Sequence, residues 1–139
     1  MLILPVGVPG AGKSYFGRQL VRRGLLRSTA IVSTDDYRGR ICDNPVDITA
    51  DSLVYEICTK VAGERLARGL DVYLDATNLV PERISELLVI ATRFGLVPNL
   101  VMFDVSDAVA LRRNSKRETP VPHERMLNAI ELRKNLDLT

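Results

Sequence analysis

The sequence has few of the residues that usually hold zinc or form disulfides. It contains two cysteines and one histidine in 139 residues. Cys42 and Cys58 form no Cys-x-x-Cys pair, and His123 has no second histidine beside it, so a zinc site is not supported. Two isolated cysteines fit a reducing compartment in which both thiols stay free. We therefore expect a cytoplasmic protein.

Long apolar runs are also missing. No apolar stretch reaches the roughly 18 residues that a membrane helix needs, so no membrane partner is expected. The apolar start runs into a glycine-rich segment without a basic leader or cleavage site, which favours a first strand over a signal peptide. We find no internal repeat, low-complexity tract or linker. The sequence therefore predicts a single domain over residues 1–139.

The charge balance gives little information about partners. The net charge of +2 is too small to indicate a nucleic-acid partner by itself. Fifteen of the 19 basic residues are arginine, which suits bidentate phosphate recognition. A genomic bias toward arginine codons explains that excess at least as well.

Residues 7–14 read Gly-Val-Pro-Gly-Ala-Gly-Lys-Ser and match the P-loop pattern Gly-x-x-x-x-Gly-Lys-[Ser/Thr]. Glycines let successive backbone N–H groups turn toward phosphate oxygens. The lysine brings a positive charge to the outer phosphates, and the serine hydroxyl can ligate Mg²⁺. The pattern predicts a nucleotide site formed by Gly7, Pro9, Gly10, Ala11, Gly12, Lys13 and Ser14.

Apolar segments typical of strands alternate with segments typical of helices. Pro5 counts against the first strand, because proline removes a donor from the sheet. The alternation predicts an α/β fold with a parallel sheet of about four strands and helices on both faces. We expect strands at 2–6, 30–33, 72–74 and 100–103, and helices from the P-loop to Gly24, from Thr34 to about 40, over 50–68, from Pro81 to Gly95, over 107–117 and beyond 122.

Helical spacing of apolar residues supports two of these helices. Over 50–68 the apolar positions Leu53, Ile57, Val61 and Leu66 predict a long amphipathic helix, and the last helix carries Met126, Leu127, Ile130 and Leu136. Ligands of such sheets bind at the carboxyl ends of the strands. The P-loop, Asp35 and Asp75 all lie at expected strand ends, so the fold should bring them together.

Other signals separate the classes of P-loop protein. The chain lacks the Asn-Lys-x-Asp motif of GTPases, and Asp75 is followed by Ala76 where many ATPases carry a catalytic glutamate. Phosphoryl transfer to an acceptor other than water is the better interpretation. Asp35 and Arg38 have i, i+3 spacing, so one could orient an acceptor hydroxyl while the other holds a phosphate. A capping carboxylate and a surface arginine would give the same spacing.

The basic stretch 112–117 pairs Arg112 with Lys116, and Arg113 with Arg117, at i, i+4. On one helix these pairs would form two cationic rows that could close over nucleotide phosphates as a lid. A solvated basic helix is the alternative.

Three segments that follow the P-loop in order carry a family resemblance: residues 35–38, residues 77–83, and residues 103–105 with 113–117. They resemble the kinase domain of the phage 5′-polynucleotide kinase family, and the likeness extends to about Arg133. The resemblance implies a three-layer P-loop kinase fold with a helical lid at about 106–120. It also implies transfer of the γ-phosphate of ATP to the 5′-OH end of DNA or RNA in nucleic-acid end repair, with ATP and Mg²⁺ as cofactors.

The resemblance further implies roles for single residues. Lys13 and Ser14 would bind the ATP phosphates and Mg²⁺, and Asp35 would be the general base on the 5′-hydroxyl. Arg38 would contact the phosphate of the acceptor. Arg117 would stabilise the transferring phosphate, with Arg113 supporting it from the lid.

Two departures from the family pattern matter. The phage enzyme has a second, phosphatase domain, and this chain ends at Thr139 without room for one, so 3′-phosphatase activity is not implied. The family has aspartate directly before Thr-Asn-Leu, whereas here that place is Ala76. Adjacent strand residues point to opposite faces, so Asp75 needs a bulge to reach the site. We expect Asp75 and Thr77 at the acceptor site, and Asp75 with Ser14 as ligands of Mg²⁺.

Two further functions remain compatible with these residues. One is a P-loop kinase that acts on a small molecule, with a sugar or nucleoside-like acceptor. The other is a non-catalytic nucleotide-binding protein.

Overall fold

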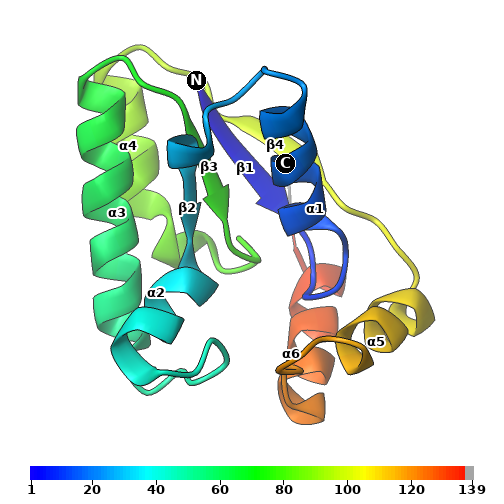
Figure 1. Cartoon of the computed structure of the whole chain (residues 1–139). Coiled ribbons are helices and arrows are strands. Elements are labelled where there is room, and N and C mark those ends of the chain that lie inside the picture. The colour runs from blue at the N-terminus through cyan, green and yellow to red at the C-terminus, as the bar shows by residue number, and fades with distance from the viewer. Residues whose placement is uncertain (137–139) are drawn as a thin grey trace.

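Four parallel strands form one sheet in the computed structural model, which describes residues 1–136 (Figure 1). The strand order is β2-β3-β1-β4, and all neighbouring strands are parallel, as the alternation of elements predicts. The sheet places the P-loop strand in the interior, between β3 and β4. The strands are β1 (Leu2–Val6), β2 (Ile31–Ser33), β3 (Val72–Asp75) and β4 (Asn99–Met102).

Helices cover both faces of the sheet, so the predicted three-layer α/β fold is confirmed (Figure 1). Leu2 and Leu4 of β1 pack with α3 and α4, whereas Ile3 packs on the other face with side chains of α1. This alternation follows from the two-residue period of a strand. The helices are α1 (Lys13–Arg22), α2 (Thr34–Cys42), α3 (Asp51–Ala67), α4 (Ser85–Arg93), α5 (Asp107–Ser115) and α6 (His123–Lys134), with 3₁₀ turns at Ser28–Ala30 and Pro81–Arg83.

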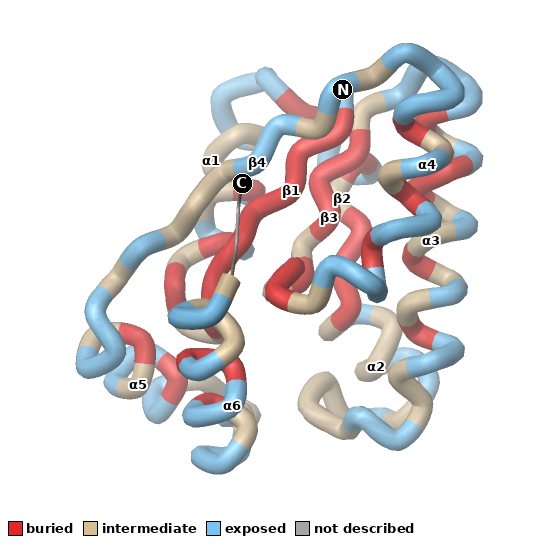
Figure 2. Tube along the Cα trace, turned by 180° about the vertical axis from the view of Figure 1, so that it is seen from behind, coloured by how far each residue is buried: buried red, intermediate tan, exposed pale blue. Residues whose placement is uncertain are grey.

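Helices α5 and α6 lie beyond the carboxyl ends of the strands (Figure 1). They pack around a third apolar cluster that contains Val6, Ala110 and Met126. Figure 2 shows β1 and β3 as buried, whereas α5 and α6 below them contain buried, intermediate and exposed residues. None of the helices in residues 1–136 is long and apolar enough to cross a membrane.

Pro5 is compatible with a central strand because of the direction in which it faces. In a strand, the N–H and C=O of one residue point toward one neighbouring strand, and those of the next residue point toward the other. The carbonyl of Val6 points toward β4, where it accepts from Phe103 N (2.9 Å). Pro5 therefore faces β3, where the register with β1 covers only Leu2–Val72 and Ile3–Tyr73. The proline sits where the ladder has already ended, so it costs the sheet no hydrogen bond.

The prediction for the apolar face of α3 is confirmed only at Leu66, which is buried. The other buried positions include Val54, Cys58 and Ala62, whereas Leu53 is 46% exposed and Ile57 and Val61 are partly buried. Small side chains allow α3 to approach its neighbours closely, and a Cβ on Gly63 would lie 3.1 Å from Ile90 Cδ1. The prediction favoured the larger apolar residues, but close packing of helix on helix selects the smaller ones.

In α6, Met126 and Ile130 are buried, whereas Leu127 is 49% exposed. Several helix boundaries differ from expectation. Helix α2 continues to Cys42, and Pro81 begins a 3₁₀ turn that precedes α4. Helix α5 ends at Ser115, so Arg117 lies beyond it.

The two cysteines should react at very different rates. Burial raises the pKa of the Cys58 thiol to about 11, and its side chain is 1% exposed, whereas Cys42 is partly exposed. Because the thiolate is the nucleophile, one thiol should react quickly with a disulfide reagent at pH 8 and the other only after unfolding. Mass spectrometry should assign the fast thiol to Cys42, and Cys42→Ser should abolish the fast phase. Fast labelling of Cys58 in the folded protein would contradict this packing.

Candidate active site

The P-loop connects β1 to α1 and surrounds the amine of Lys13. Lys13 Nζ donates to the carbonyl oxygens of Gly7 (2.8 Å) and Val8 (2.7 Å). Burial lowers the pKa of Lys13 to about 8, although the nearby Asp75 and Asp35 carboxylates act in the opposite direction. A desolvated cation at a helix N-terminus gains strongly from an anion placed beside it. This loop is therefore built to receive phosphate.

Asn78 fixes the point where β1 and β3 separate. Its Nδ2 donates to the carbonyl oxygens of Pro5 (2.7 Å), Leu74 (3.1 Å) and Ala76 (3.3 Å). Asn78 has a φ of 52°, a left-handed conformation that asparagine tolerates better than most residues. The backbone N–H of Gly7 donates to Thr77 O (3.1 Å), so the loop after β3 is tied to the P-loop. Asn78 and Thr77 belong to the 77–83 segment that carries the family resemblance, but the sequence assigned no role to Asn78.

Asp75 reaches the P-loop without a bulge, contrary to the expectation from the sequence. Its Oδ2 accepts a hydrogen bond from Ser14 Oγ (2.7 Å), and β2 and β3 stay in regular register up to Ser33–Asp75. Tyr73, two residues earlier on the same face, donates from its hydroxyl to Lys13 O (2.6 Å). Asp75, which appeared out of register from the sequence, therefore lies on the face of β3 that α1 covers.

Ser14 and Asp75 offer oxygen atoms of the kind that Mg²⁺ prefers. Burial raises the pKa of Asp75, while the Ser14 hydrogen bond and the charge of Lys13 oppose this shift. Residues 1–136 contain no group of three or more His, Cys, Asp or Glu side chains that could hold a metal ion. Magnesium commonly binds through one or two protein oxygens together with phosphates and water.

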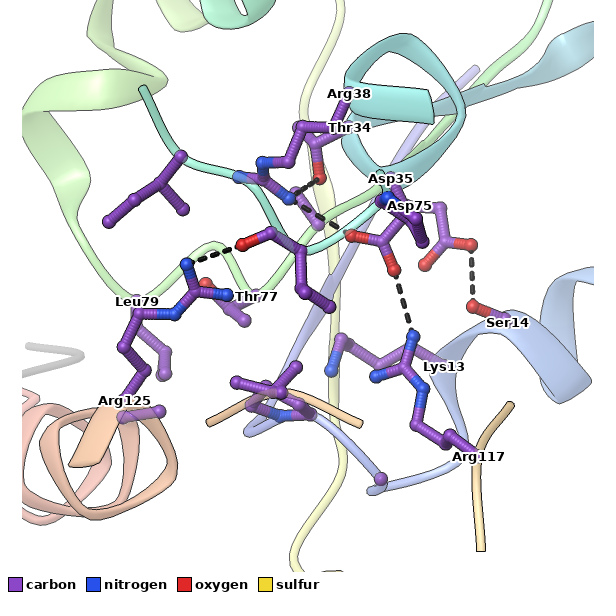
Figure 3. A pocket seen from close by; sticks show the side chains of 18 of the residues that line it. Lys13, Ser14, Thr34, Asp35, Arg38, Asp75, Thr77, Leu79, Arg117 and Arg125 are labelled. Atoms are coloured by element: carbon purple, nitrogen blue, oxygen red, sulfur yellow. Dashed lines mark hydrogen bonds and ion pairs between the residues drawn. The ribbon is translucent and has the colours of Figure 1, made fainter. Parts of the chain in front are cut away.

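Asp35 lies in the first turn of α2, with both carboxylate oxygens engaged by arginines (Figure 3). Its Oδ1 accepts from Arg38 Nη1 (2.9 Å), and its Oδ2 accepts from Arg117 Nη2 (2.9 Å). The N-cap is Ser33, whose Oγ accepts from Asp36 N (3.2 Å), so Asp35 does not serve as the capping residue. The carboxylate is 42% exposed and lines the cleft.

Arg38 is held in a fixed position by Asp51, a residue that sequence reasoning missed. Arg38 Nε and Nη2 donate to the two oxygens of Asp51 (2.8 and 3.0 Å). Burial lowers the pKa of Arg38, but the hydrogen bonds and charge of Asp51 outweigh it, so the pKa is raised above its usual range. Arg83 Nη1 also lies 3.8 Å from Asp51 and stacks on the Tyr55 ring, 4.8 Å from its centroid. Only a contact across the fold reveals Asp51, because it is the first residue of another helix.

The lid differs from the two cationic rows that the sequence suggested. Helix α5 ends at Ser115, and Asn114 Nδ2 donates to Val121 O (2.9 Å) while Val121 N donates to Asn114 Oδ1 (3.0 Å). This pair closes the segment after α5, so Arg117 leaves the helix and reaches Asp35. Arg113 stays on α5 and donates from Nη1 to Gly10 O (3.4 Å).

The side chains gather around one cleft of about 560 Å³. Most of the predicted site residues line this cleft. The exceptions are the P-loop residues Gly7 and Ala11, which are buried. Seven cationic side chains line the cleft against three carboxylates, so a polyanionic ligand is favoured. The cations are Lys13, Arg18, Arg38, Arg83, Arg113, Arg117 and Arg125, and the carboxylates are Asp35, Asp51 and Asp75.

Comparisons with known proteins agree on the fold. A family model described as "AAA domain" matches residues 2–135, whereas a comparison with curated proteins gave no match. A chain in the structure of the Pnkp1/Rnl/Hen1 RNA repair complex is similar with a TM-score of 0.77 at 20% identity, over 99% of this chain and 46% of that one. The present chain thus spans about half the length of that relative.

A gluconokinase from Sinorhizobium meliloti 1021 is also similar, with a TM-score of 0.62 at 20% identity over 94% of this chain and 73% of that one. The chain therefore has a P-loop kinase fold, and its structural neighbours include both an RNA repair complex and a small-molecule kinase.

Gly10 should be the glycine at which a methyl group does most harm. It has a φ of +84°, and a Cβ there would lie 2.6 Å from Ala110 O of the lid. Gly24 has a φ of +70° with nothing within 4 Å of its added Cβ, so Gly24→Ala measures the backbone strain alone. Overlap in a packed region should make Gly10→Ala more destabilising than Gly24→Ala by about 1–3 kcal/mol in urea unfolding. Equal losses would show that the lid does not pack on the loop in this way.

Proposed function

The chain belongs to the AAA domain family, and we propose that it is an ATP-dependent polynucleotide 5′-hydroxyl kinase that acts on DNA or RNA ends. The observation that carries this proposal is the position of Asp35. Its carboxylate faces the P-loop cleft from the end of β2, with Arg38 on one oxygen and Arg117 on the other. A base with flanking cations opposite a phosphate cradle is what phosphoryl transfer to a hydroxyl needs.

The donor half of the site consists of the P-loop, Lys13 and the lid arginines. The backbone of residues 9–14 and the amine of Lys13 would hold the phosphates of ATP, with Arg113 above Gly10. Ser14 and Asp75 would hold Mg²⁺, which when bound neutralises phosphate charge. The negative phosphates would attract Arg117 away from Asp35 and leave Oδ2 free.

The acceptor half would then carry out the proton transfer. The 5′ oxygen attacks the γ-phosphorus, and the bond from that phosphorus to the β–γ bridging oxygen breaks. ADP leaves with that oxygen, and the hydroxyl proton passes to Oδ2 of Asp35. Arg38, fixed by Asp51, keeps the other oxygen of Asp35 in place and can contact the acceptor phosphate.

The excess of cations favours an acceptor that carries its own phosphates. The nucleotide would engage Lys13, Arg113 and Arg117. Of the remaining arginines of the cleft, Arg18 and Arg125 have no carboxylate oxygen of residues 1–136 within 4.0 Å. The likeness to a chain of an RNA repair complex supports the same choice. The likeness to a gluconokinase makes a small hydroxy-acid kinase the second candidate, because such an acceptor is also anionic.

A transfer assay distinguishes the two candidates. With γ-labelled ATP and Mg²⁺, we expect label on 5′-OH DNA or RNA oligonucleotides and none on the same oligonucleotides that already carry a 5′-phosphate. Gluconate and free nucleosides serve as small acceptors. Turnover on a small acceptor with no label on any oligonucleotide would refute the polynucleotide proposal, and binding of ATP without any product would support a non-catalytic role.

Replacing the base should stop chemistry and preserve nucleotide binding. Asp35→Asn keeps the size of the side chain but cannot accept the proton, so kcat should fall by about 10²–10⁴-fold, as for other general bases. The Kd for ATP should change little, because the base acts only in the chemical step. Asp36→Asn is the matched control, since Asp36 is the next residue, is exposed and does not line the cleft. Near-normal turnover by Asp35→Asn would remove Asp35 from the mechanism.

A further inference from the structure

Not every cation of the cleft has a carboxylate partner. Among residues 1–136, four of the seven have no carboxylate oxygen within 4.0 Å: Lys13, Arg18, Arg113 and Arg125. Lys13 and Arg113 contact the P-loop and belong to the donor half. Arg125 lies elsewhere, in the first turn of α6. Figure 3 places it on the Thr77 and Leu79 side of the hollow, while Arg117 lies on the Lys13 side.

Helix α6 turns one continuous face toward the cleft. Arg125, Asn128, Ala129 and Leu132 all line it, at i, i+3, i+4 and i+7. The opposite wall is the loop between α2 and α3, through Pro45, Val46 and Ile48. The face therefore combines a cation, an amide and apolar side chains, which matches the phosphate, base edge and sugar of a nucleotide.

The side chain of Arg125 crosses the cleft to a partner that carries no charge. Its Nη1 donates to the backbone carbonyl of Val46 (2.6 Å), and this is the one hydrogen bond that the Arg125 side chain makes to residues 1–136. A guanidinium has five N–H donors, and it binds a phosphate more strongly than a neutral carbonyl. A phosphate in the cleft would therefore compete well for this side chain.

The loop that receives Arg125 also leads to the residue that anchors Arg38. Val46 accepts from Arg125, and Asp51, five residues later, holds Arg38 through two hydrogen bonds. The two arginines thus flank the same loop segment. Since Arg38 adjoins the base, Arg125 marks the continuation of the acceptor half away from the P-loop.

We infer that Arg125, with Asn128 and Leu132, forms a second acceptor subsite that binds the next phosphodiester along the strand. Arg38 takes the phosphate nearest the reacting end, and Arg125 takes the following one. This inference rests on the proposed polynucleotide kinase function. It makes Arg125 a binding residue that selects a strand over a mononucleotide and takes no part in the chemical step.

Acceptors with one neutral linkage test the subsite directly. 5′-OH oligonucleotides carry a single uncharged methylphosphonate at either the first or the second linkage, and kcat/KM is measured for each. In the wild type, neutralising the second linkage should lower kcat/KM about tenfold, mainly through KM, because a charge-assisted contact is lost. In Arg125→Gln the all-phosphate acceptor should show that loss already, and the second methylphosphonate should add almost nothing.

Matched variants isolate the contact. Arg125→Gln should keep the sensitivity to the first linkage, and its kinetics with ATP and with a nucleoside 3′-monophosphate should be unchanged. Arg125→Lys should restore part of the sensitivity to the second linkage. Lys134→Gln removes one charge from the same helix outside the cleft and should behave as the wild type.

The outcomes separate this inference from the function on which it rests. Transfer to oligonucleotides with equal sensitivity to the second linkage in Arg125→Gln and the wild type would overturn the subsite alone. Equilibrium binding of the same fluorescent oligonucleotides is measured in parallel, so the subsite is tested even without turnover. If neither protein discriminates the second linkage in binding or in transfer, the inference is wrong.

Discussion

The amide of Asn78 is the contact on which the phosphate site depends. A parallel sheet would normally continue β1 against β3, but here their pairing stops after Ile3–Tyr73. The carbonyl groups freed at that point are buried and need donors. Asn78 Nδ2 donates to Pro5, Leu74 and Ala76, and Leu74 O also accepts from Ala76 N (3.0 Å). The strands can then diverge, and the P-loop enters the crevice with Lys13 at its centre. Without such a donor, opening the sheet here would cost about 1–3 kcal/mol for each unpaired group.

Charge placement then divides this crevice into two halves. In the proposed function, Lys13 and the Ser14–Asp75 pair form the donor side, and Arg38 with Asp51 forms the acceptor side. Asp35 would be the base between them, and Arg117 would couple the two sides, because its guanidinium pairs with Asp35 and nucleotide phosphates would compete for it. The ion pair that compensates the charge of Arg117 before binding would then restrain the base until the donor has arrived. Its exposure means that solvent screens it, so the cost of opening it is modest.

Much of this arrangement could be predicted from the sequence, and the exceptions have physical causes. The P-loop glycines and the alternation of strands and helices are local patterns, so they predicted the parallel sheet and the position of the nucleotide site. The face of α3 was misjudged because small residues such as Ala62 and Gly63 pack closest, which hydrophobic spacing does not reveal. Asp51 and Arg125 were missed because their partners are supplied by other elements, 13 and 79 residues away. The orientation of Asp75 could not be predicted, because it depends on the tertiary structure, in which α1 covers one particular face of β3.

In the proposed polynucleotide kinase, selectivity for a strand would follow from how the arginines are anchored. An arginine that a carboxylate already neutralises, as Asp51 does for Arg38, gains less from a phosphate than one held by a carbonyl. Arg38 is thus suited to fixed positioning beside the base, since its geometry exists before the acceptor arrives. Arg125 has no carboxylate oxygen of residues 1–136 within 4.0 Å, although Asp47 interacts with its charge from farther away, so Arg125 can gain more from binding than Arg38 can. An acceptor that carries only the first phosphate would meet the positioning arginine and leave the uncompensated one without a ligand. The cleft should therefore discriminate by the number of linked phosphates rather than by the identity of the terminal base.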